Sequence, residues 1–178
     1  MKDLVIDADI MRASGTTEHP VSNNACLILE MVREKGHRLV QTRALKAEHD
    51  KHQSRFAATW RGSMVARKQW VLIDVPEDVG LRERLAVPQN PESAKDEAAV
   101  LKDAHLLEAA AASGNRVISN DTTAKQLFQK ACPLPAPHGR ILWADTTAHP
   151  EEGVRWVEGD CPEWPDWRIC PRTVNPAR

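Results

Sequence analysis

A helical period of apolar positions runs from residue 95 to residue 113, near the middle of the chain. Residues at this spacing share one face of a helix, and the apolar positions are Val100, Ala104, Leu107 and Ala111. Gly114 ends the predicted helix. The β-branched pair Val117 and Ile118 then predicts a short buried strand that stops at Asp121. The stretch is therefore predicted to form a helix, a glycine stop and a strand.

Two carboxylates of this stretch are predicted to lie at the same level. Asp103 stands at the margin of the apolar helix face. A helix rises ~1.5 Å per residue, so Asp103 lies about 15 Å along the helix axis from the turn that follows the helix. Asp121 ends the strand, about 17 Å forward at ~3.3 Å per residue. Two carboxylates so close together repel each other, and a shared proton or a bound cation relieves this repulsion. In the alternative interpretation, Asp103 is a solvated helix residue and Asp121 caps a helix that begins at Thr122.

Acidic residues also follow the first two predicted strands. Residues 4–6 are a short apolar run typical of a strand buried on both faces, and Asp7 and Asp9 come directly after it. Residues 38–41 give a second strand, followed by a helix with Glu48 near its second turn. The carboxyl ends of parallel strands meet at one edge of a sheet, where open α/β sheets place their sites. Asp7 and Glu48 are therefore expected beside the first two carboxylates.

The remaining segments alternate in the same way between helix and strand. Further helices are predicted at residues 24–35 (capped by Asn24), 42 onward (capped by Thr42), 54–68, 76–85 and 122–132, with a last strand at 140–144 and an ambiguous segment at 70–75. This alternation favours a parallel sheet with helices on both faces. The predicted fold class is α/β, a three-layer α/β/α domain over residues 1–145 with a mainly parallel sheet of four or five strands.

Residues 146–178 form a C-terminal extension of different composition. From Asp145 onward the chain holds Trp156, Trp164 and Trp167 and five of its twelve prolines. Such a segment is too rich in proline for regular elements and too apolar for plain disorder. We predict that it packs against the domain, with a partner interface as the alternative.

Composition places the chain among ordinary globular proteins. Its 178 residues are 42% hydrophobic and 28% charged, with a net charge of -1. The absence of a signal-peptide pattern and of long apolar runs predicts a cytoplasmic protein with no membrane contact. Residues 43–68 nevertheless carry seven Lys or Arg against two acids. A polyanion would bind there, although such a run often marks only a solvated helix face.

Cysteine and histidine give no clear site. The four cysteines have no C-x-x-C spacing, which does not favour zinc, and a cytoplasmic compartment disfavours disulfides. His49 and His52 lie on a basic helix, where such residues are usually exposed. His105 is predicted to face solvent because it lies away from the apolar stripe of its helix.

The converging carboxylates predict a metal site. Asp7, Glu48, Asp103 and Asp121 offer hard oxygen ligands, which suit Mg²⁺ or Mn²⁺. Ions held in this way can activate water and neutralise charge on a phosphodiester, so phosphodiester hydrolysis is the predicted chemistry. Outer ligands are predicted at Asp9 and at Asp96, although Asp96 also fits a capping box with Ser93. The residues predicted to hold a nucleic-acid backbone are Arg43, Lys46, Lys51 and Arg55.

Four acidic segments together resemble the motifs of PIN-domain nucleases in order and rough spacing. The segments are residues 5–9, 44–48, 103–110 and 117–121, and the resemblance covers about residues 1–145. It implies that Asp7, Glu48, Asp103 and Asp121 bind one or two divalent metals, and that Ser119 orients the last motif. The family usually has Asn, Ser or Thr at the position of Asp9.

The resemblance also implies a biological setting. RNA is the common substrate of such nucleases, and many act as toxins neutralised by an antitoxin, so a toxin or a defence nuclease is implied, with an antitoxin or other protein as partner. The chain departs from the compact toxins in its long region 53–91 and its tryptophan-rich C-terminal extension. A homodimer is compatible with the sequence.

Two other functions remain open at this stage. Asp7-Ala8-Asp9 after a buried strand also resembles the nucleophile motif of haloacid-dehalogenase-like phosphatases, with Asp7 as nucleophile. That family expects Thr or Val where Met11 stands, and it has no use for Glu48. The third class is a non-catalytic RNA- or protein-binding module. Clustered acids beside a phosphate groove argue against a pure binder.

Overall fold

The computed structural model of the chain describes residues 1–15, 17–86 and 94–171, and for residues 94–96 the backbone alone. Its strands form one sheet: β1 (Asp3–Ile6), β2 (Arg38–Gln41), β3 (Trp70–Leu72), β4 (Arg116–Ser119) and β5 (Leu142–Asp145). Neighbouring strands are parallel, in the order β3-β2-β1-β4-β5. Strands β2 and β3 lie on one side of β1, and β4 and β5 lie on the other. The strand order therefore reverses between β1 and β4, which is the topological switch point.

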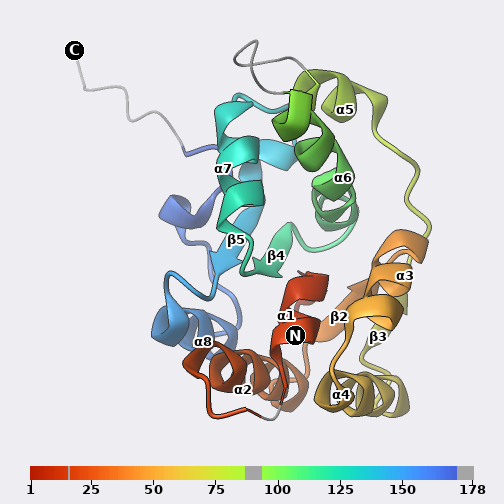
Figure 1. Cartoon of the computed structure of the whole chain (residues 1–178), viewed down its shortest axis with the longest axis vertical. Coiled ribbons are helices and arrows are strands. Elements are labelled where there is room, and N and C mark those ends of the chain that lie inside the picture. Colours follow the sequence, from red (N-terminus) through yellow and green to blue (C-terminus); the bar gives the residue numbers. More distant parts are fainter. Residues whose placement is uncertain (16, 87–93, 172–178) are drawn as a thin grey trace.

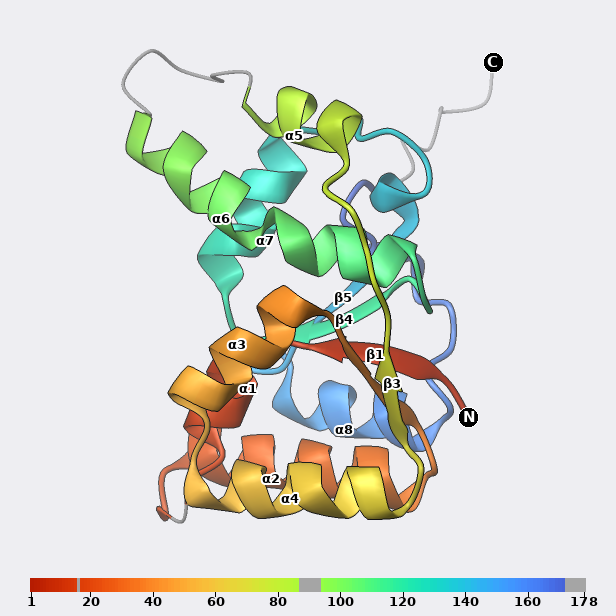
Figure 2. The same cartoon turned by 90° about the vertical axis from the view of Figure 1, so that its right-hand side faces the viewer.

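Helices cover both faces of this sheet (Figures 1 and 2). One face carries α2 (Pro20–Glu34), α4 (Arg55–Ala66) and α8 (Pro150–Glu158), and the other carries α5 (Val79–Leu85), α6 (Ala94–Ala111) and α7 (Thr122–Lys130). The short α1 (Ala8–Ala13) and α3 (Arg43–His52) follow the carboxyl ends of β1 and β2. The predicted three-layer α/β/α class is confirmed. None of the helices in the described ranges is long and apolar enough to cross a membrane.

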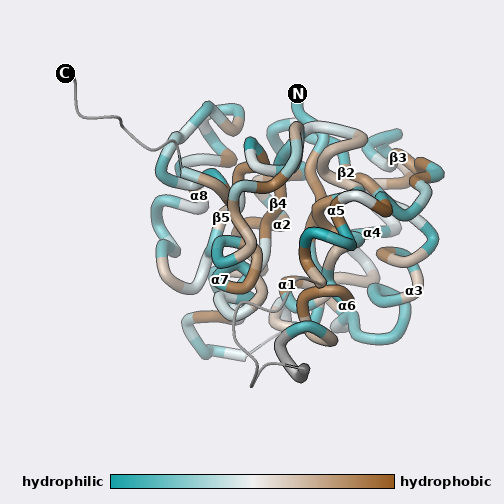
Figure 3. Tube along the Cα trace, turned by 90° about the horizontal axis from the view of Figure 1, so that it is seen from above, coloured by the Kyte–Doolittle hydropathy of each residue, from teal (hydrophilic) through white to brown (hydrophobic). Residues whose placement is uncertain are grey.

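Successive strand residues point into two separate cores. The core between the sheet and helices α5, α6 and α7 contains Val5, Val40, Val117 and Trp143. The core between the sheet and helices α2, α4 and α8 contains Leu4, Ile6, Leu39, Ile118, Leu142 and Ala144. All of these side chains are fully buried. A strand covered on both faces needs apolar residues at consecutive positions, which explains the uninterrupted apolar runs, and Figure 3 shows hydrophobic colour along the strands.

The turn from α6 to β4 requires the glycine that the sequence pattern predicts. A Cβ at Gly114 would overlap the backbone oxygen of Asp3 at the start of β1. Asn115 follows with a positive φ of 53°, and its amide donates to the carbonyl of Ala110 at 2.8 Å. The close passage of backbone at this point brings β4 in beside β1.

Three elements begin at residues other than the predicted ones. The second helix begins at Pro20 instead of residue 24, because His19 accepts a hydrogen bond from the Val21 amide (3.3 Å) and proline suits the first helical position. The helix predicted at 76–85 begins at Val79, capped by Asp78. The last strand begins at Leu142, after a 3₁₀ turn η1 (His138–Arg140).

The C-terminal extension contains regular structure, contrary to the prediction from its prolines. Helix α8 begins with Pro150 at its first position, where the missing amide proton costs nothing. Trp156 and Val157 of this helix are buried in the core shared with α2. Trp167, in the 3₁₀ turn η2 (Pro165–Trp167), packs edge to face on Trp164 with ring centroids 4.6 Å apart. Pro150 and Pro165 lie at the start of these elements, so they permit regular structure.

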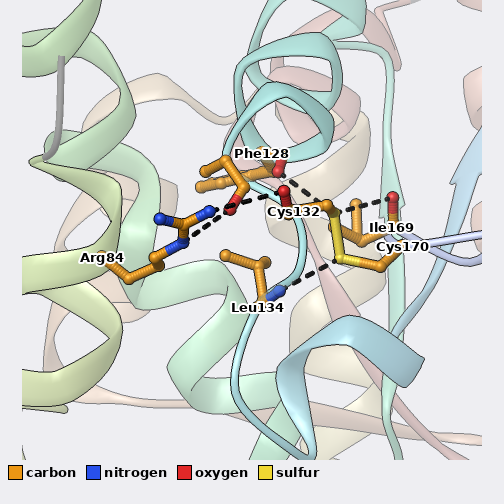
Figure 4. Close-up of a disulfide and its surroundings, with 7 residues drawn as sticks. Arg84, Phe128, Cys132, Leu134, Ile169 and Cys170 are labelled. Atoms are coloured by element: carbon orange, nitrogen blue, oxygen red, sulfur yellow. Dashed lines mark hydrogen bonds between the residues drawn. A yellow bond between two sulfur atoms is a disulfide. The ribbon is translucent and has the colours of Figure 1, made fainter. Parts of the chain in front are cut away.

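A disulfide joins Cys132 to Cys170, which contradicts the expectation of reduced cysteines (Figure 4). The bridge connects the end of α7 to the returning C-terminal segment across a sequence separation of 38 residues. Nearby, Arg84 of α5 donates from Nε to the carbonyl of Ala131 at 3.0 Å. The local sequence gave no sign of this pairing, because the two cysteines meet only after the extension has folded back. Cys26 and Cys161 are free.

Candidate metal centre

A cavity of about 350 Å³ opens at the carboxyl ends of β1 and β4, beside the topological switch point. Its acidic lining comes from five residues on four separate segments of the chain: Asp7 and Asp9, Glu48, Asp103, and Asp121. In Figure 2, β1 and β4 end on the left, between α6 and the pair α1 and α3. The structure therefore brings together the four carboxylates that the sequence placed at one edge, with Asp9 beside them.

Ser119 links the acid that follows β1 to the acid that follows β4. Its fully buried hydroxyl donates to Oδ2 of Asp7 at 2.7 Å and accepts from the Asp121 amide at 2.9 Å. Burial raises the pKa of the Asp7 carboxyl, although the Ser119 hydrogen bond lowers it in part. This hydroxyl therefore joins the Asp7 carboxylate to the backbone amide of Asp121.

Asp9, in the first turn of α1, has one satisfied and one unsatisfied carboxylate oxygen. Oδ2 accepts from the Asn120 amide at 2.8 Å. Oδ1 is buried and has no hydrogen-bond partner within the described part of the chain. Burial, and next the charge of Asp7, raise the pKa of Asp9 to about 8. A buried acceptor without a partner is costly, and either a proton or a cation would relieve it.

Glu48 is paired with His105, which the sequence pattern wrongly placed in solvent. Nε2 of His105 lies 3.2 Å from Oε2 of Glu48, within ion-pair distance though outside hydrogen-bond geometry. Nδ1 of His105 lies 2.9 Å from the carbonyl oxygen of Lys102, which can only accept, so Nδ1 carries a proton. A bare Nε2 would then face the carboxylate lone pairs. The ring is therefore cationic when Glu48 is ionised.

The electrostatics of this pair agree with its geometry. Burial alone disfavours a charge on His105, but the contact with Glu48 outweighs it and raises the His105 pKa. The same contact lowers the pKa of Glu48, against the effect of burial. The contact with His105 therefore favours the ionised form of Glu48. His105 thereby keeps Glu48 aimed at the cavity.

His49, the neighbour of Glu48 in α3, is fully buried and not exposed as expected. Its Nε2 donates to the carbonyl of Ile6 at 2.8 Å, and its Nδ1 accepts from Nε2 of Gln41 at 3.1 Å. Burial lowers the pKa of His49 to about 4, so the ring is neutral. These bonds fix α3 to the ends of β1 and β2. The position of Glu48 follows from this attachment.

Asp121 fits both of its interpretations at once. Its Oδ1 accepts from the Ala124 amide at 2.8 Å and so caps α7, while the residue also lines the cavity. Asp103 reaches the same cavity from α6, and burial raises its pKa to about 6, with Asp7 and Asp121 adding to the shift and Lys102 opposing it. The side chain of Asp96 and the cap residue Ser93 lie outside the described residues.

The carboxylate oxygens of this cavity are of the ligand type that Mg²⁺ and Mn²⁺ prefer. Within the described ranges, no three His, Cys, Asp or Glu side chains lie in an arrangement that could hold a metal by themselves. Mg²⁺ keeps several of its waters and takes only one or two carboxylates directly, so a wide ring of acids suits it. The unpartnered oxygen of Asp9 and the raised pKa values of Asp7, Asp9 and Asp103 mark the site as short of positive charge.

The predicted basic contacts are only partly at this cavity. Lys51 lines it. Lys46 instead pairs with Asp50 at 2.6 Å on the surface of α3. Arg43 lines a neighbouring cavity of about 210 Å³ that also includes His105. Arg55 is exposed at the start of α4.

Sequence reasoning missed two basic cavity residues, Arg12 and Lys102, and it took His52, which also lines the cavity, as an exposed helix residue. Arg12 stands three residues after Asp9 in α1, and Lys102 directly precedes Asp103 in α6. Residues three apart on a helix share a face, and this spacing was a usable signal for Arg12.

Comparison of the chain with protein-family models, with curated proteins and with solved structures finds no match.

The stability of the metal-free protein is expected to fall between pH 5 and pH 8. Because the pKa of Asp9 rises from 3.8 to about 8 on folding, the folded state binds a proton that the unfolded state has lost, and stability decreases as pH rises. Asp9→Asn removes this proton exchange. In chelator at pH 8 the variant should be more stable than the wild type by more than about 1.4 kcal/mol, the equivalent of one pKa unit.

Urea unfolding at pH 5 and pH 8 measures this difference. Glu34→Gln, which neutralises an exposed carboxylate at the end of α2, is the control and should leave the pH dependence unchanged. Equal stabilities of Asp9→Asn and wild type at pH 8 would show that Asp9 is not held as a strained anion.

Proposed function

We propose that this protein is a nuclease dependent on Mg²⁺ or Mn²⁺, and that it acts on RNA. The observation that carries the proposal is the convergence of Asp7, Glu48, Asp103 and Asp121 on one cavity at the topological switch point. These residues come from four different segments, so their convergence places several anions where only cations or protons make them stable together. The resemblance of the same segments to PIN-domain nucleases supports this function and suggests RNA.

The chain's own residues have distinct parts in this mechanism. Asp7, Glu48, Asp103 and Asp121 would hold the metal, with Asp9 as an outer ligand, and the metal would supply an activated water and neutralise charge on the phosphodiester. Ser119 fixes the Asp7 carboxylate through its 2.7 Å hydrogen bond. His105 fixes Glu48 and balances one negative charge of the cavity. Such outer contacts keep metal-binding carboxylates in position.

A cleavage assay tests the proposal directly. Mixed RNA and DNA oligonucleotides are incubated with the purified protein in Mg²⁺, in Mn²⁺ and in chelator. We expect RNA to be cut with either metal and to stay intact in chelator, and the product ends to fix which bond is broken. Cleavage that is unaffected by chelator would contradict the proposal.

The phosphatase remains the second candidate because of one observation. Asp9, two residues after Asp7, has a pKa of about 8, so it can hold the proton that an acid in a phosphatase mechanism donates. Burial also raises the pKa of Asp7, which favours the uncharged acid over the nucleophilic carboxylate and so counts against the phosphatase. Trapping of a phospho-aspartate at Asp7 with a phosphate analogue would favour the phosphatase.

A pure binding module predicts a different response to metal. Calorimetric titration with Mn²⁺ should show binding if the carboxylates are a metal site. Absence of Mn²⁺ binding, together with nucleic-acid affinity that ignores metal, would favour the binder.

A further inference from the structure

The two edges of the sheet differ in what covers them. The outer edge of β5 is covered by the C-terminal extension, where Leu142 forms an antiparallel bridge with Arg168. The amide of Ile169 also donates to the carbonyl of Ile141 at 2.9 Å. The outer edge of β3 has no strand beside it in the part of the chain that the structure describes. The backbone groups of this edge are therefore available to a strand from another molecule.

Two residues of β3 direct their backbone groups outward. The Leu39 amide of β2 donates to the Gln69 carbonyl at 2.8 Å, and the Ile73 amide donates to a carbonyl of β2 at 2.9 Å. Bonding direction alternates along a strand, so Trp70 and Leu72 turn their N–H and C=O groups away from β2. Leu72 is also 64% exposed. The edge thus offers both hydrogen-bonding groups and an apolar side chain.

The charges at the two ends of β3 make this edge complementary to itself. Arg67 and Lys68 precede the strand, and Asp74 follows it. Lys68 and Asp74 are both exposed, and neither forms an ion pair within the described ranges. They stand three residues before and three residues after Val71, the middle residue of the strand. An antiparallel copy of β3, with a two-fold axis at Val71, therefore places each Lys68 opposite Asp74 of the other copy.

The same register satisfies the backbone and covers the apolar side chain. Trp70 of one copy lies opposite Leu72 of the other, and their outward N–H and C=O groups form a hydrogen-bonded pair. Two-fold symmetry gives two such pairs. Each also brings an aromatic ring against an aliphatic side chain, a stabilising cross-strand contact. A parallel copy in register would instead bring like charges together, with Lys68 beside Lys68.

We propose that the outer edge of β3 binds a second copy of this chain, and that the pairing joins two five-stranded sheets into one across a two-fold axis at Val71. The strands of the two copies run in opposite directions. The two acidic cavities, which lie at carboxyl ends of strands, are therefore at opposite ends of the joined sheet, and neither contributes residues to the other. The inference does not depend on what these cavities bind.

Sedimentation of the full chain with exchanged charges tests the pairing. The wild type should form a dimer at about 100 µM. Lys68→Glu puts an acid opposite Asp74, and Asp74→Lys puts a base opposite Lys68, so each change should weaken dimerisation about ten-fold or more. The double variant should dimerise again, and the two single variants should dimerise with each other when mixed, because opposite charges meet in both cases.

A charge change elsewhere is the matched control for sedimentation. Lys130→Glu makes the same change at an exposed residue at the end of α7 and should leave dimerisation at the wild-type level. Because the substituted side chains are exposed, thermal midpoints of all variants should stay near that of the wild type. A variant that loses the dimer while it keeps its midpoint has lost the contact and not the fold.

Cysteine cross-linking tests the position of the axis. Antiparallel partners that do not share hydrogen bonds have Cα atoms about 4.5 Å apart, which is within reach of a disulfide. Val71→Cys should therefore give a covalent dimer under mild oxidation. Val79→Cys, at an exposed valine outside β3, should cross-link no more than the wild type, in which Cys26 and Cys161 are free.

Three results would each overturn the inference. The first is a wild type that sediments as a monomer at about 100 µM. The second is a dimer whose affinity is the same in the wild type and in both single variants at Lys68 and Asp74, because such a dimer is held through another surface. The third is Val71→Cys that cross-links no better than Val79→Cys.

Discussion

Replacing Asp7 or Asp121 by asparagine is expected to lower metal-dependent cleavage of RNA at least about 1,000-fold, which corresponds to about 4 kcal/mol of transition-state stabilisation. Asparagine has nearly the same shape but no negative charge, so it weakens the hold on the metal without a change in packing. Its side-chain oxygen can still accept the bonds from Ser119 at position 7 and from the Ala124 amide at position 121.

The same substitutions should leave the fold intact or make it more stable, because each removes an anion from a crowded cavity. Cleavage rates and thermal midpoints in chelator are measured side by side. Glu34→Gln serves as a control of equal charge change on the exposed surface of α2. Wild-type rates in both purified variants would remove the basis for the proposed function, whereas lost activity with lost folding would leave the loss of activity unexplained by metal binding.

Removing the Cys132–Cys170 bridge is expected to lower the free energy of unfolding by about 2–4 kcal/mol. The bridge closes a loop with a sequence separation of 38 residues, and in its absence the unfolded chain gains the entropy of that loop. The loop contains β5 and α8, so the loss affects an edge of the sheet and a helix of the outer layer. Metal-dependent activity at low temperature should remain, because neither cysteine lines the cavity.

Urea unfolding of the Cys132→Ala/Cys170→Ala double variant under non-oxidising and oxidising conditions measures this effect. Reductant should destabilise the wild type to the level of the double variant and leave the variant unchanged. Cys26→Ala, at a free and half-buried cysteine, is the matched control. If reductant has no effect on wild-type stability, the bridge is not formed in solution.

Features that depend on local pattern could be predicted from the sequence. Consecutive apolar residues such as Leu4, Val5 and Ile6 fill two cores at once, so they reveal a strand with both faces covered. Parallel strands then fix the edge at which Asp7 and Asp121 emerge. The rise per residue of a helix and of a strand predicted that Asp103 lies at the same level as Asp121.

Features that depend on partners distant in the sequence could not be predicted. His49 lies on a helix rich in charged residues and is buried because Gln41 and the Ile6 carbonyl satisfy its ring. His105 lies off the apolar stripe of α6 and is covered because Glu48 arrives from another helix. In the C-terminal extension, Pro150 looked like a break and is instead the first residue of α8.

Asp121 divides its carboxylate between two tasks. Oδ1 receives the Ala124 amide, and the residue faces the cavity. A cation that binds this carboxylate must therefore change the polarisation of the Ala124 amide, in the first turn of α7. The Ala124 resonance in a nitrogen–proton correlation spectrum would act as a built-in reporter of occupancy, readable before any substrate is known.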